Sequence, residues 1–275
     1  MQYRWIIDLG SHSAKLYHLK SGELIICCLR SWQWIKNKYD SNTIYTQLSS
    51  LLTEFAVNGP TLAIGTAALR NNQVLKKHAE QACKKLAIPL KVLSQQQEAN
   101  LIGLACKHYG YNENYTIIDA GGGSIQLIQP DQGILFYSYG LNYLTQQFNL
   151  STKPENRNTK QCIDWLTSQL PKSINSFIYT GGEKRYLEHL GIPLIKDKCT
   201  KADFIELASQ LVEKPLNELR QLSPFDPKWM DGAIASNCLI VALLNKCSED
   251  FFMVNNLTIV DGLPFAKELV ASRAY

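Results

Sequence analysis

The sequence has no apolar run that approaches the roughly 20 residues needed to cross a bilayer, so we expect no membrane-spanning helix. The opening residues, MQYRWIIDLG, carry Asp8 where a secretory signal peptide needs an apolar core, so we expect no secretion signal. The chain has eight cysteines, but no two have Cys-x-x-Cys spacing and no histidine cluster accompanies them, which argues against a zinc site. Scattered cysteines without a targeting signal are typical of reduced thiols in the cytoplasm.

The sequence also lacks a strong excess of charge of either sign. It has 28 Lys and Arg against 24 Asp and Glu, a net charge of +4. This balance suits an anionic small ligand but is too weak to indicate a specific nucleic-acid partner. With 45% hydrophobic and 19% charged residues, the composition is that of a folded globular protein. The 275 residues are enough for two domains of ordinary size.

The most informative feature present is an internal repeat. Residues 6–24 read IIDLGSHSAKLYHLKSGEL, and residues 117–135 read IIDAGGGSIQLIQPDQGIL. The two stretches align without a gap at a constant offset of 111 and are identical at eight of 19 positions. Chance would give roughly one identity, so we interpret the pair as an internal duplication.

Each copy of the repeat predicts three strands joined by two turns. The predicted strands are 3–8, 14–19 and 23–29 in the first copy, and 115–119, 124–129 and 133–138 in the second. Gly22 and Gly133 mark the second turn of each copy. After the first copy the pattern predicts helix 41–57, strand 61–65, helix 72–87, strand 90–93 and helix 95–108. After the second it predicts helices 141–149 and 159–170, strand 176–179, further helices, and a long helix 228–246.

Two such successions predict an α/β protein with two domains that face each other across a cleft, each with a mixed sheet covered by helices. We expect the first domain to span residues 1–114 and the second residues 115–262. Pro264 fits the first turn of a terminal helix, 263–275, that could pack on the first domain.

The first turn of each copy has a composition suited to phosphate. A strand that ends in Asp8 or Asp119, followed by Gly-x-x-Ser, can direct several backbone N–H groups outward as an anion-binding concavity. Glycine permits close approach and positive φ values. The two aspartates could bind Mg²⁺, which prefers carboxylates and water. For a single copy we would favour a simple tight hairpin; two copies across a cleft favour phosphate binding.

Two further segments are ambiguous from sequence alone. In YTGGEKR, Gly181 and Gly182 lie between a predicted strand and a helix, which is a phosphate-site position but as often a helix-entry turn. Glu98 lies in the first turn of helix 95–108, where the helix dipole alone would explain an acid.

Four segments together resemble motifs of the exopolyphosphatase/guanosine pentaphosphatase (Ppx/GppA) family, in matching order and spacing. They are DLGSHSAK at 8–15, TAALR at 66–70, SQQQEAN at 94–100 and DAGGGSIQ at 119–126. YSYGLNYLTQQF at 137–148, the Gly181–Gly182 turn and IVDGL at 259–263 are weaker echoes. The resemblance spans nearly the whole chain and corresponds to the short form of the family. It implies two duplicated ribonuclease H-like domains of the actin-like ATPase superfamily.

The resemblance also implies an activity: release of terminal phosphate from inorganic polyphosphate or guanosine pentaphosphate (pppGpp) with the aid of Mg²⁺. Glu98 stands at the position of the family's catalytic glutamate and would activate water. The implied phosphate-binding residues are Gly10, Ser11, Ser13, Arg70, Gly121, Gly122, Gly123, Ser124, Gly181 and Gly182. The implied metal ligands are Asp8 and Asp119. His12, Lys15 and Gln126 stand where the motifs have Asn, Arg and Glu, and we expect them to support the site. A homodimer is a further expectation from the family.

Three hypotheses follow from these residues. The first is a phosphoanhydride hydrolase, for which the sequence does not choose between the two substrates. The second is a catalytically weakened relative that binds polyphosphate or nucleotide, indicated by Gln97 and Gln126 in place of acids. The third is a sugar-kinase-like or chaperone-like ATPase on the same fold, although no adenine-side motif is visible.

A basic stretch completes the set of candidate features. It contains Lys76, Lys77, Lys84, Lys85 and Lys91. Such a run is usually a solvated helix face, and we keep that as the default. The alternative is that it guides polyphosphate towards the cleft, with a strength that falls as salt rises.

Overall fold

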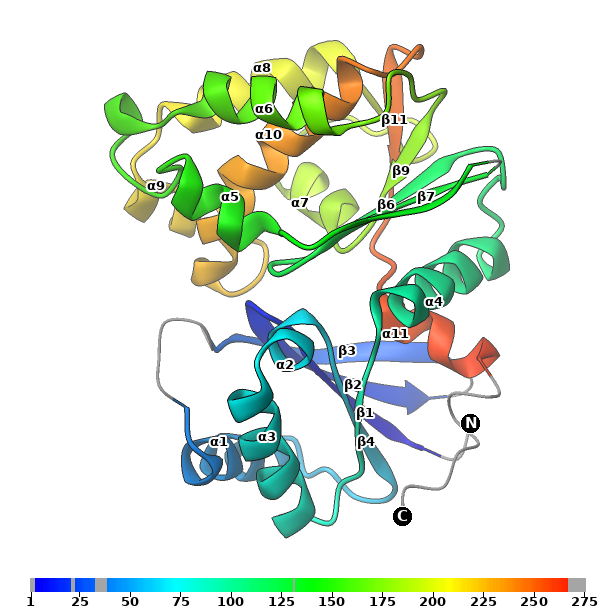
Figure 1. The fold of residues 1–275 in the computed structure, drawn as a ribbon, viewed down its shortest axis with the longest axis vertical. Helices are drawn as coiled ribbons and strands as arrows, with labels where there is room; N and C mark the ends of the chain where they lie inside the picture. The colour runs from blue at the N-terminus through cyan, green and yellow to red at the C-terminus, as the bar shows by residue number, and fades with distance from the viewer. Residues whose placement is uncertain (1–2, 21–22, 33–38, 131, 267–275) are drawn as a thin grey trace. The chain divides into compact units, whose positions relative to one another are not determined.

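A computed structural model describes residues 3–20, 23–32, 39–130 and 132–266. The chain divides into two compact units (Figure 1). Unit 1 comprises Met1–Ala105 together with Ile259–Tyr275, and unit 2 comprises Cys106–Thr258. The chain thus passes from one unit to the other after Ala105 and returns after Thr258, whereas the sequence placed these crossings after residues 114 and 262. The predicted cleft between the domains stays a prediction.

Unit 1 contains a five-stranded sheet built from the first copy of the repeat. Its strands are β1 (Trp5–Leu9), β2 (Ser13–Lys20), β3 (Glu23–Ser31), β4 (Thr61–Gly65) and β5 (Leu90–Val92). They lie in the order β3-β2-β1-β4-β5. The first three are antiparallel, and β4 and β5 continue the sheet in parallel with β1. The three predicted strands are therefore confirmed, while Gly22 of the predicted second turn lies outside the described residues.

The helices of unit 1 lie between and after its strands in the sequence, and some of them begin at a polar side chain that caps them. They are α1 (Ser41–Glu54), α2 (Ala67–Asn71), α3 (Gln73–Lys85), α4 (Gln95–His108, whose last turn belongs to unit 2) and α11 (Ile259–Gly262). The predicted helix 72–87 starts at Gln73 because the Asn72 side chain accepts the Leu75 N–H at 3.0 Å and caps it. That cap separates α3 from α2, which the sequence analysis did not foresee. Ile7, Leu16 and Leu48 belong to the core between the sheet and these helices.

Unit 2 repeats the sheet and adds one strand. Its strands are β6 (Thr116–Ala120), β7 (Ile125–Gln129), β8 (Gly133–Tyr137), β9 (Phe177–Tyr179), β10 (Lys198–Thr200) and β11 (Phe251–Val254). The order β8-β7-β6-β9-β11 matches that of unit 1, with the same antiparallel and parallel pairs, and β10 lies antiparallel on β11 at the edge. Gly133 has a φ of +83°, as the predicted turn requires. β10 and β11 were not predicted from the sequence.

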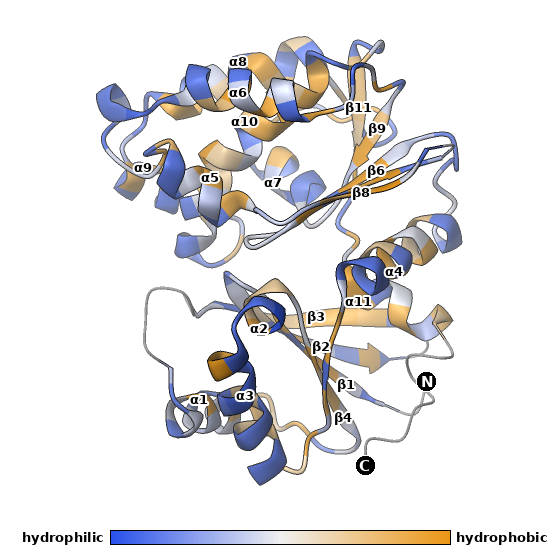
Figure 2. Cartoon of the chain, in the orientation of Figure 1, coloured by the Kyte–Doolittle hydropathy of each residue, from blue (hydrophilic) through white to orange (hydrophobic). Residues whose placement is uncertain are grey.

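The helices of unit 2 gather around one buried helix. They are α5 (Leu141–Gln147), α6 (Thr159–Gln169), α7 (Glu183–His189), α8 (Lys201–Val212), α9 (Leu216–Gln221) and α10 (Ala233–Leu244). Nearly every residue of α10 is buried, and Figure 2 shows the helix as almost wholly hydrophobic. The predicted helix 228–246 is wrong at its start, because 227–232 form a 3₁₀ helix in which Asp226 caps the Lys228 N–H at 2.9 Å.

Both sheets have the ribonuclease H-like strand order, which confirms the predicted fold class: a mixed α/β protein with a duplicated domain. Within the described part of the chain, no helix combines the length and hydropathy that a membrane span requires. Each of the eight cysteines is a free thiol. The predicted terminal helix is seen only as a 3₁₀ turn, Leu263–Phe265, and residues 267–275 lie outside the described residues.

One close approach holds the returning segment of unit 1 in place. Gly262, at the end of α11, packs on α4 so tightly that a Cβ atom there would lie 2.0 Å from the Leu101 carbonyl oxygen. The neighbouring atoms belong to the α4 backbone, which cannot turn aside as a side chain could. Gly262 is therefore required for the contact that fixes α4 within unit 1.

We predict that Gly262→Ala lowers the free energy of unfolding by about 1–3 kcal/mol, because the added methyl group overpacks the α11–α4 contact. Gly103→Ala is the matched control, since no atom lies within 4 Å of its added Cβ in α4. It should raise stability by about 0.5–1 kcal/mol, as expected for Gly→Ala inside a helix. Urea denaturation measures both changes; a Gly262→Ala variant as stable as the wild type would contradict the account.

Candidate functional site

The two turns of the duplicated repeat have the same backbone geometry. The Gly10 N–H donates to the Ser13 carbonyl at 3.0 Å, and the Gly121 N–H donates to the Ser124 carbonyl at 2.9 Å. A Cβ at Gly10 would lie 3.0 Å from the Ser13 carbonyl oxygen, which is tighter than a side chain normally packs. The duplication seen in sequence is thus a structural repeat of one loop, present once in each unit.

The motif aspartates end equivalent strands but have different neighbours. Asp8 lies opposite Lys15 across β1 and β2, and Asp119 lies opposite Gln126 across β6 and β7. Burial raises the pKa of Asp8, and the nearby Lys15 ammonium opposes that rise. Among the described residues, Asp8 Oδ1 has no hydrogen-bond partner although it is buried. A buried carboxylate oxygen without a partner is the kind of atom that a cation would satisfy.

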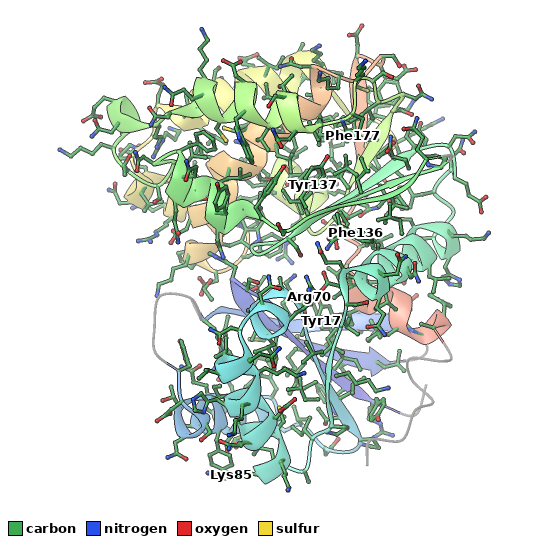
Figure 3. All side chains as sticks on the ribbon, in the orientation of Figure 1. Tyr17, Arg70, Lys85, Phe136, Tyr137 and Phe177 are labelled. Carbon is green, nitrogen blue, oxygen red and sulfur yellow. The ribbon has the colours of Figure 1, made fainter. Side chains whose placement is uncertain are left out.

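Gln126 is integrated into the loop of unit 2 as a neutral residue. Its side chain is buried, and its Nε2 donates to Ser124 Oγ at 3.2 Å. On the neighbouring strand β8, the residue paired with Gln126 is Phe136, which is partly exposed (Figure 3). Lys15 and Gln126 occupy the same position of the repeat, so one copy places a cation beside its aspartate and the other places an amide.

The carbonyl side of the loop in unit 2 is held by the start of α5. The N–H groups of Leu141 and Asn142 donate to the carbonyls of Gly121 and Gly122, each at 3.0 Å. A Cβ at Gly140 would come within 2.5 Å of the Gly121 oxygen and the Ser124 nitrogen. Gly140, the last residue of the YSYG segment noted in the sequence, is therefore explained by its close packing against the loop. These bonds fix the backbone of the loop against the start of α5 within unit 2.

A second constellation lies in unit 1, at the N-terminal end of α4. Arg70 on α2 donates from Nη1 to Glu98 Oε1 at 2.5 Å and to the Leu93 carbonyl at 2.8 Å. The Glu98 side chain is 5% exposed and that of Arg70 is 20% exposed. The sequence predicted both residues as site residues but gave no reason for them to touch. The structure joins them into one buried ion pair with an accessible cation.

The glutamines before Glu98 have structural partners. Ser94 caps α4: its Oγ accepts the Gln97 N–H at 3.2 Å, while Gln97 Oε1 accepts the Ser94 N–H at 2.9 Å. This reciprocal pair is a capping box, in which Gln serves as well as Glu. Gln96 donates to Asn100 Oδ1 one turn later at 2.9 Å. Gln97 therefore stabilises the helix that carries Glu98.

The Gly181–Gly182 turn follows β9 and begins α7 in unit 2. The φ values of the two glycines, +95° and +112°, explain their identity. The Gly181 N–H donates to the Leu257 carbonyl at 2.8 Å, so it is used within the unit. A Cβ at Gly182 would lie 3.2 Å from the ring of Phe225, over which Arg185 places its guanidinium at 5.0 Å. These contacts are those of a packed helix-entry turn.

A buried acid that the sequence did not reveal, Glu183, follows this turn. Glu183 is 3% exposed, and its Oε1 has no hydrogen-bond partner among the described residues. Burial raises the pKa of Glu183 to about 8. Nearby, Tyr179 and Ser236 join their hydroxyls at 2.8 Å. An acid at the start of a helix is an ordinary sequence feature, and only the fold of unit 2 shows that this one is buried.

The predicted site residues thus fall into two sets. Unit 1 brings together Arg70 and Glu98, and it carries the loop with Asp8, Gly10, Ser11, His12, Ser13 and Lys15. Unit 2 carries Asp119, Gly121, Gly122, Gly123, Ser124 and Gln126, together with Gly181 and Gly182. The described residues contain no group of three or more His, Cys, Asp or Glu that could cage a metal. Mg²⁺ usually keeps several waters and binds through one or two carboxylates, so a site at Asp8, whose buried Oδ1 has no partner among the described residues, needs no such cage.

Comparison with known proteins gives one family. The model of the Ppx/GppA phosphatase family matches residues 43–222, more than half of the chain. No curated protein matches this chain.

Several solved structures share the fold. A Ppx/GppA family member from Aquifex aeolicus is 19% identical, covers 98% of both chains and has a TM-score of 0.71. An exopolyphosphatase from Cytophaga hutchinsonii is 16% identical over 95% of this chain and 96% of its own, with a TM-score of 0.74. An exopolyphosphatase-like protein is 15% identical over 97% and 99%, with a TM-score of 0.73. At these identities the likeness shows the fold.

We predict that stability falls as pH rises from about 4.5 to about 8, in part because Glu183 must stay protonated in the folded state. Its folded pKa lies above the unfolded value, so the unfolded chain ionises first and is favoured as pH rises through this window. Glu183→Gln removes this contribution. Between these pH values the free energy of unfolding of the wild type should therefore fall by a few kcal/mol, as an order of magnitude, more than that of the variant.

Urea denaturation at a series of pH values measures the difference. Glu188→Gln on the exposed face of α7 is the control and should follow the wild type. The comparison concerns the slope with pH, so a constant offset from the new amide does not affect it. Parallel curves for Glu183→Gln and the wild type would show that Glu183 is ionised in the fold.

Proposed function

This chain belongs to the Ppx/GppA phosphatase family, and we propose on that premise that it is a phosphoanhydride hydrolase that releases terminal phosphate from inorganic polyphosphate or pppGpp. The observation that carries the proposal is the buried Arg70–Glu98 pair at 2.5 Å. It joins an acid that can accept a proton to a guanidinium that can bind a phosphate. The family match also favours this hypothesis over a kinase-like or chaperone-like ATPase.

The pair supports a mechanism in which the substrate itself releases the base. Without substrate, Arg70 Nη1 donates to Glu98 Oε1 and so occupies the carboxylate. A terminal phosphoryl group offers Arg70 competing oxygens in a geometry that a guanidinium fork binds well. As Arg70 turns to the phosphate, Glu98 becomes free to take a proton from a water molecule. The water oxygen then bonds to the terminal phosphorus. The anhydride P–O bond breaks, and the shortened polyphosphate or nucleotide is the leaving group.

The remaining site residues would bind and position the phosphates. In this proposal, the loop of Gly10, Ser11 and Ser13 and the loop of Gly121 to Ser124 contact phosphate oxygens through backbone N–H groups and hydroxyls. Lys15 adds a positive charge on the face of the sheet that carries Asp8. His12 and Gln126 support the two loops. Gly181 and Gly182 would contribute through the geometry of their turn, since the Gly181 N–H is bonded within unit 2.

Asp8 and Asp119 are the residues that would hold Mg²⁺. The fit rests on the unpartnered, buried Oδ1 of Asp8 and on the preference of Mg²⁺ for carboxylate oxygens with retained water. When bound, the ion would neutralise charge on the phosphate oxygens. The homodimer and the cytoplasmic location stay predictions.

We predict that Glu98→Gln lowers kcat for phosphate release by about 10²–10⁴-fold, because the amide cannot accept the proton from water. The amide keeps an oxygen for Arg70, so the fold of unit 1 should survive, and thermal unfolding checks this. Phosphate release from long-chain polyphosphate and from pppGpp, each with Mg²⁺, measures the effect.

Glu218→Gln is the control, since it removes one exposed carboxylate from α9 of unit 2 and should leave kcat unchanged. Equal rates for Glu98→Gln and the wild type would remove Glu98 as the base. A loss that is shared by Glu218→Gln would point to a general electrostatic effect instead.

A second function is favoured by one observation, the buried amide of Gln126 beside Asp119. A neutral residue here provides one carboxylate fewer for a metal than the family motif does. A protein that binds polyphosphate or nucleotide without efficient turnover would follow from this loss. Calorimetric binding without phosphate release would support it, and gain of activity in Gln126→Glu would identify the missing carboxylate as the cause.

A further inference from the structure

The positive charge of this chain is concentrated in one stretch of unit 1. Residues 67–91 contain six Lys and Arg but one acid, Glu80. The rest of the chain has 22 basic and 23 acidic residues, so the net charge of +4 arises from this stretch. A solvated helix face with no ligand usually mixes both signs. This segregation is a reason to look for an anionic partner.

Helix α3 directs two of these charges straight into solvent. Its buried face is formed by Leu75, Ala79, Ala82 and Cys83. Lys77 and Lys84, two turns apart, lie on the opposite face and are exposed. Within the described part of the chain neither ammonium has an ion pair. Figure 2 shows the outer face of α3 as largely hydrophilic.

The other lysines of α3 already have partners. Lys76 lies 3.9 Å from Glu80. Lys85 donates to Asn42 Oδ1 at 3.1 Å and places its ammonium 5.8 Å from the centre of the Tyr45 ring. Lys77 and Lys84 are therefore the charges of this helix that remain available to a ligand.

The strip begins beside the candidate catalytic pair. Arg70 lies on α2, which ends at Asn71, and α3 starts at Gln73. The 13 residues of α3 extend for about 20 Å. In Figure 3, Arg70 and Lys85 mark opposite ends of this helical segment of unit 1. The two free lysines thus lie along a path that leads away from Arg70.

We propose that Lys77 and Lys84 form an accessory binding strip for long-chain polyphosphate. The strip holds the part of the polyanion that extends beyond the catalytic site, so this inference rests on the proposed function. A linear polyphosphate carries charge at every unit, and it can meet two separated lysines without a fixed register. Guanosine pentaphosphate has no run of more than three phosphates, so it cannot lay a continuous polyanion along α3 while its terminal phosphate lies at Arg70. The strip therefore selects substrates by length.

The test compares chain lengths in the variant Lys77→Gln/Lys84→Gln. With polyphosphate of several hundred units, we expect KM to rise about threefold to tenfold at about 50 mM salt, with kcat unchanged. The difference should shrink at about 300 mM salt, where exposed charges are screened. With tripolyphosphate and with pppGpp, KM should equal that of the wild type. Lys160→Gln/Lys172→Gln is the matched control, because it removes the same charge from exposed positions of unit 2 and should leave every KM unchanged.

Two kinetic outcomes would overturn the proposal. One is an unchanged KM for long chains at low salt, and the other is an equal rise of KM for long and short substrates. An equal loss of affinity for a single-stranded DNA oligonucleotide would overturn the assignment to polyphosphate, because the strip would then serve any polyanion.

A binding measurement separates this inference from the proposed hydrolysis. Fluorescence anisotropy of labelled long-chain polyphosphate, recorded with EDTA so that no turnover occurs, should show the same threefold to tenfold loss in Lys77→Gln/Lys84→Gln. If the wild type releases no phosphate but this loss is observed, the hydrolysis fails and the strip stands. If the wild type is active and no loss is observed, the strip fails and the hydrolysis stands.

Discussion

The ion pair between Arg70 and Glu98 is the interaction on which the proposed chemistry depends. Its two residues come from helices that follow different strands, and the Leu93 carbonyl at the end of β5 fixes the guanidinium from a third direction. A buried acid with its partner removed would be strongly unfavourable, so the pair constrains α2 and α4 together. The close approach of Gly262 to Leu101 packs α11 on α4 one turn later. The geometry of the Arg70–Glu98 pair is therefore set by packing within unit 1.

The two copies of the duplicated loop share a backbone geometry but differ in the side chain beside the aspartate. Both copies keep the Gly N–H to Ser carbonyl bond and the aspartate at the end of the preceding strand. The residue opposite each aspartate differs: Lys15 places a cation beside Asp8, and Gln126 places an amide beside Asp119. The loop of unit 1 thus carries a positive charge that the loop of unit 2 lacks. This asymmetry agrees with the location of the chain's excess lysines.

Much of the fold could be predicted because the repeat and the hydrophobic periodicity are local. Strand 61–65 and helix 95–108 have the bounds that their patterns predict. The break between α2 and α3 depends on one Asn72 cap, and the late strands β10 and β11 are too short to stand out from loops. The sequence could nominate Arg70 and Glu98 through family motifs, but their contact joins residues 28 positions apart through tertiary packing. The burial of Glu183 likewise depends on helices far along the chain.

The most direct test of the central claim is phosphate release by the purified wild-type protein from long-chain polyphosphate, tripolyphosphate and pppGpp, titrated with Mg²⁺. Release of terminal phosphate should rise with Mg²⁺ to saturation for at least one of these substrates, if the chain is a hydrolase. Binding of all three substrates without phosphate release at any Mg²⁺ concentration would contradict the proposed hydrolysis and would identify the chain as a binding protein of this family.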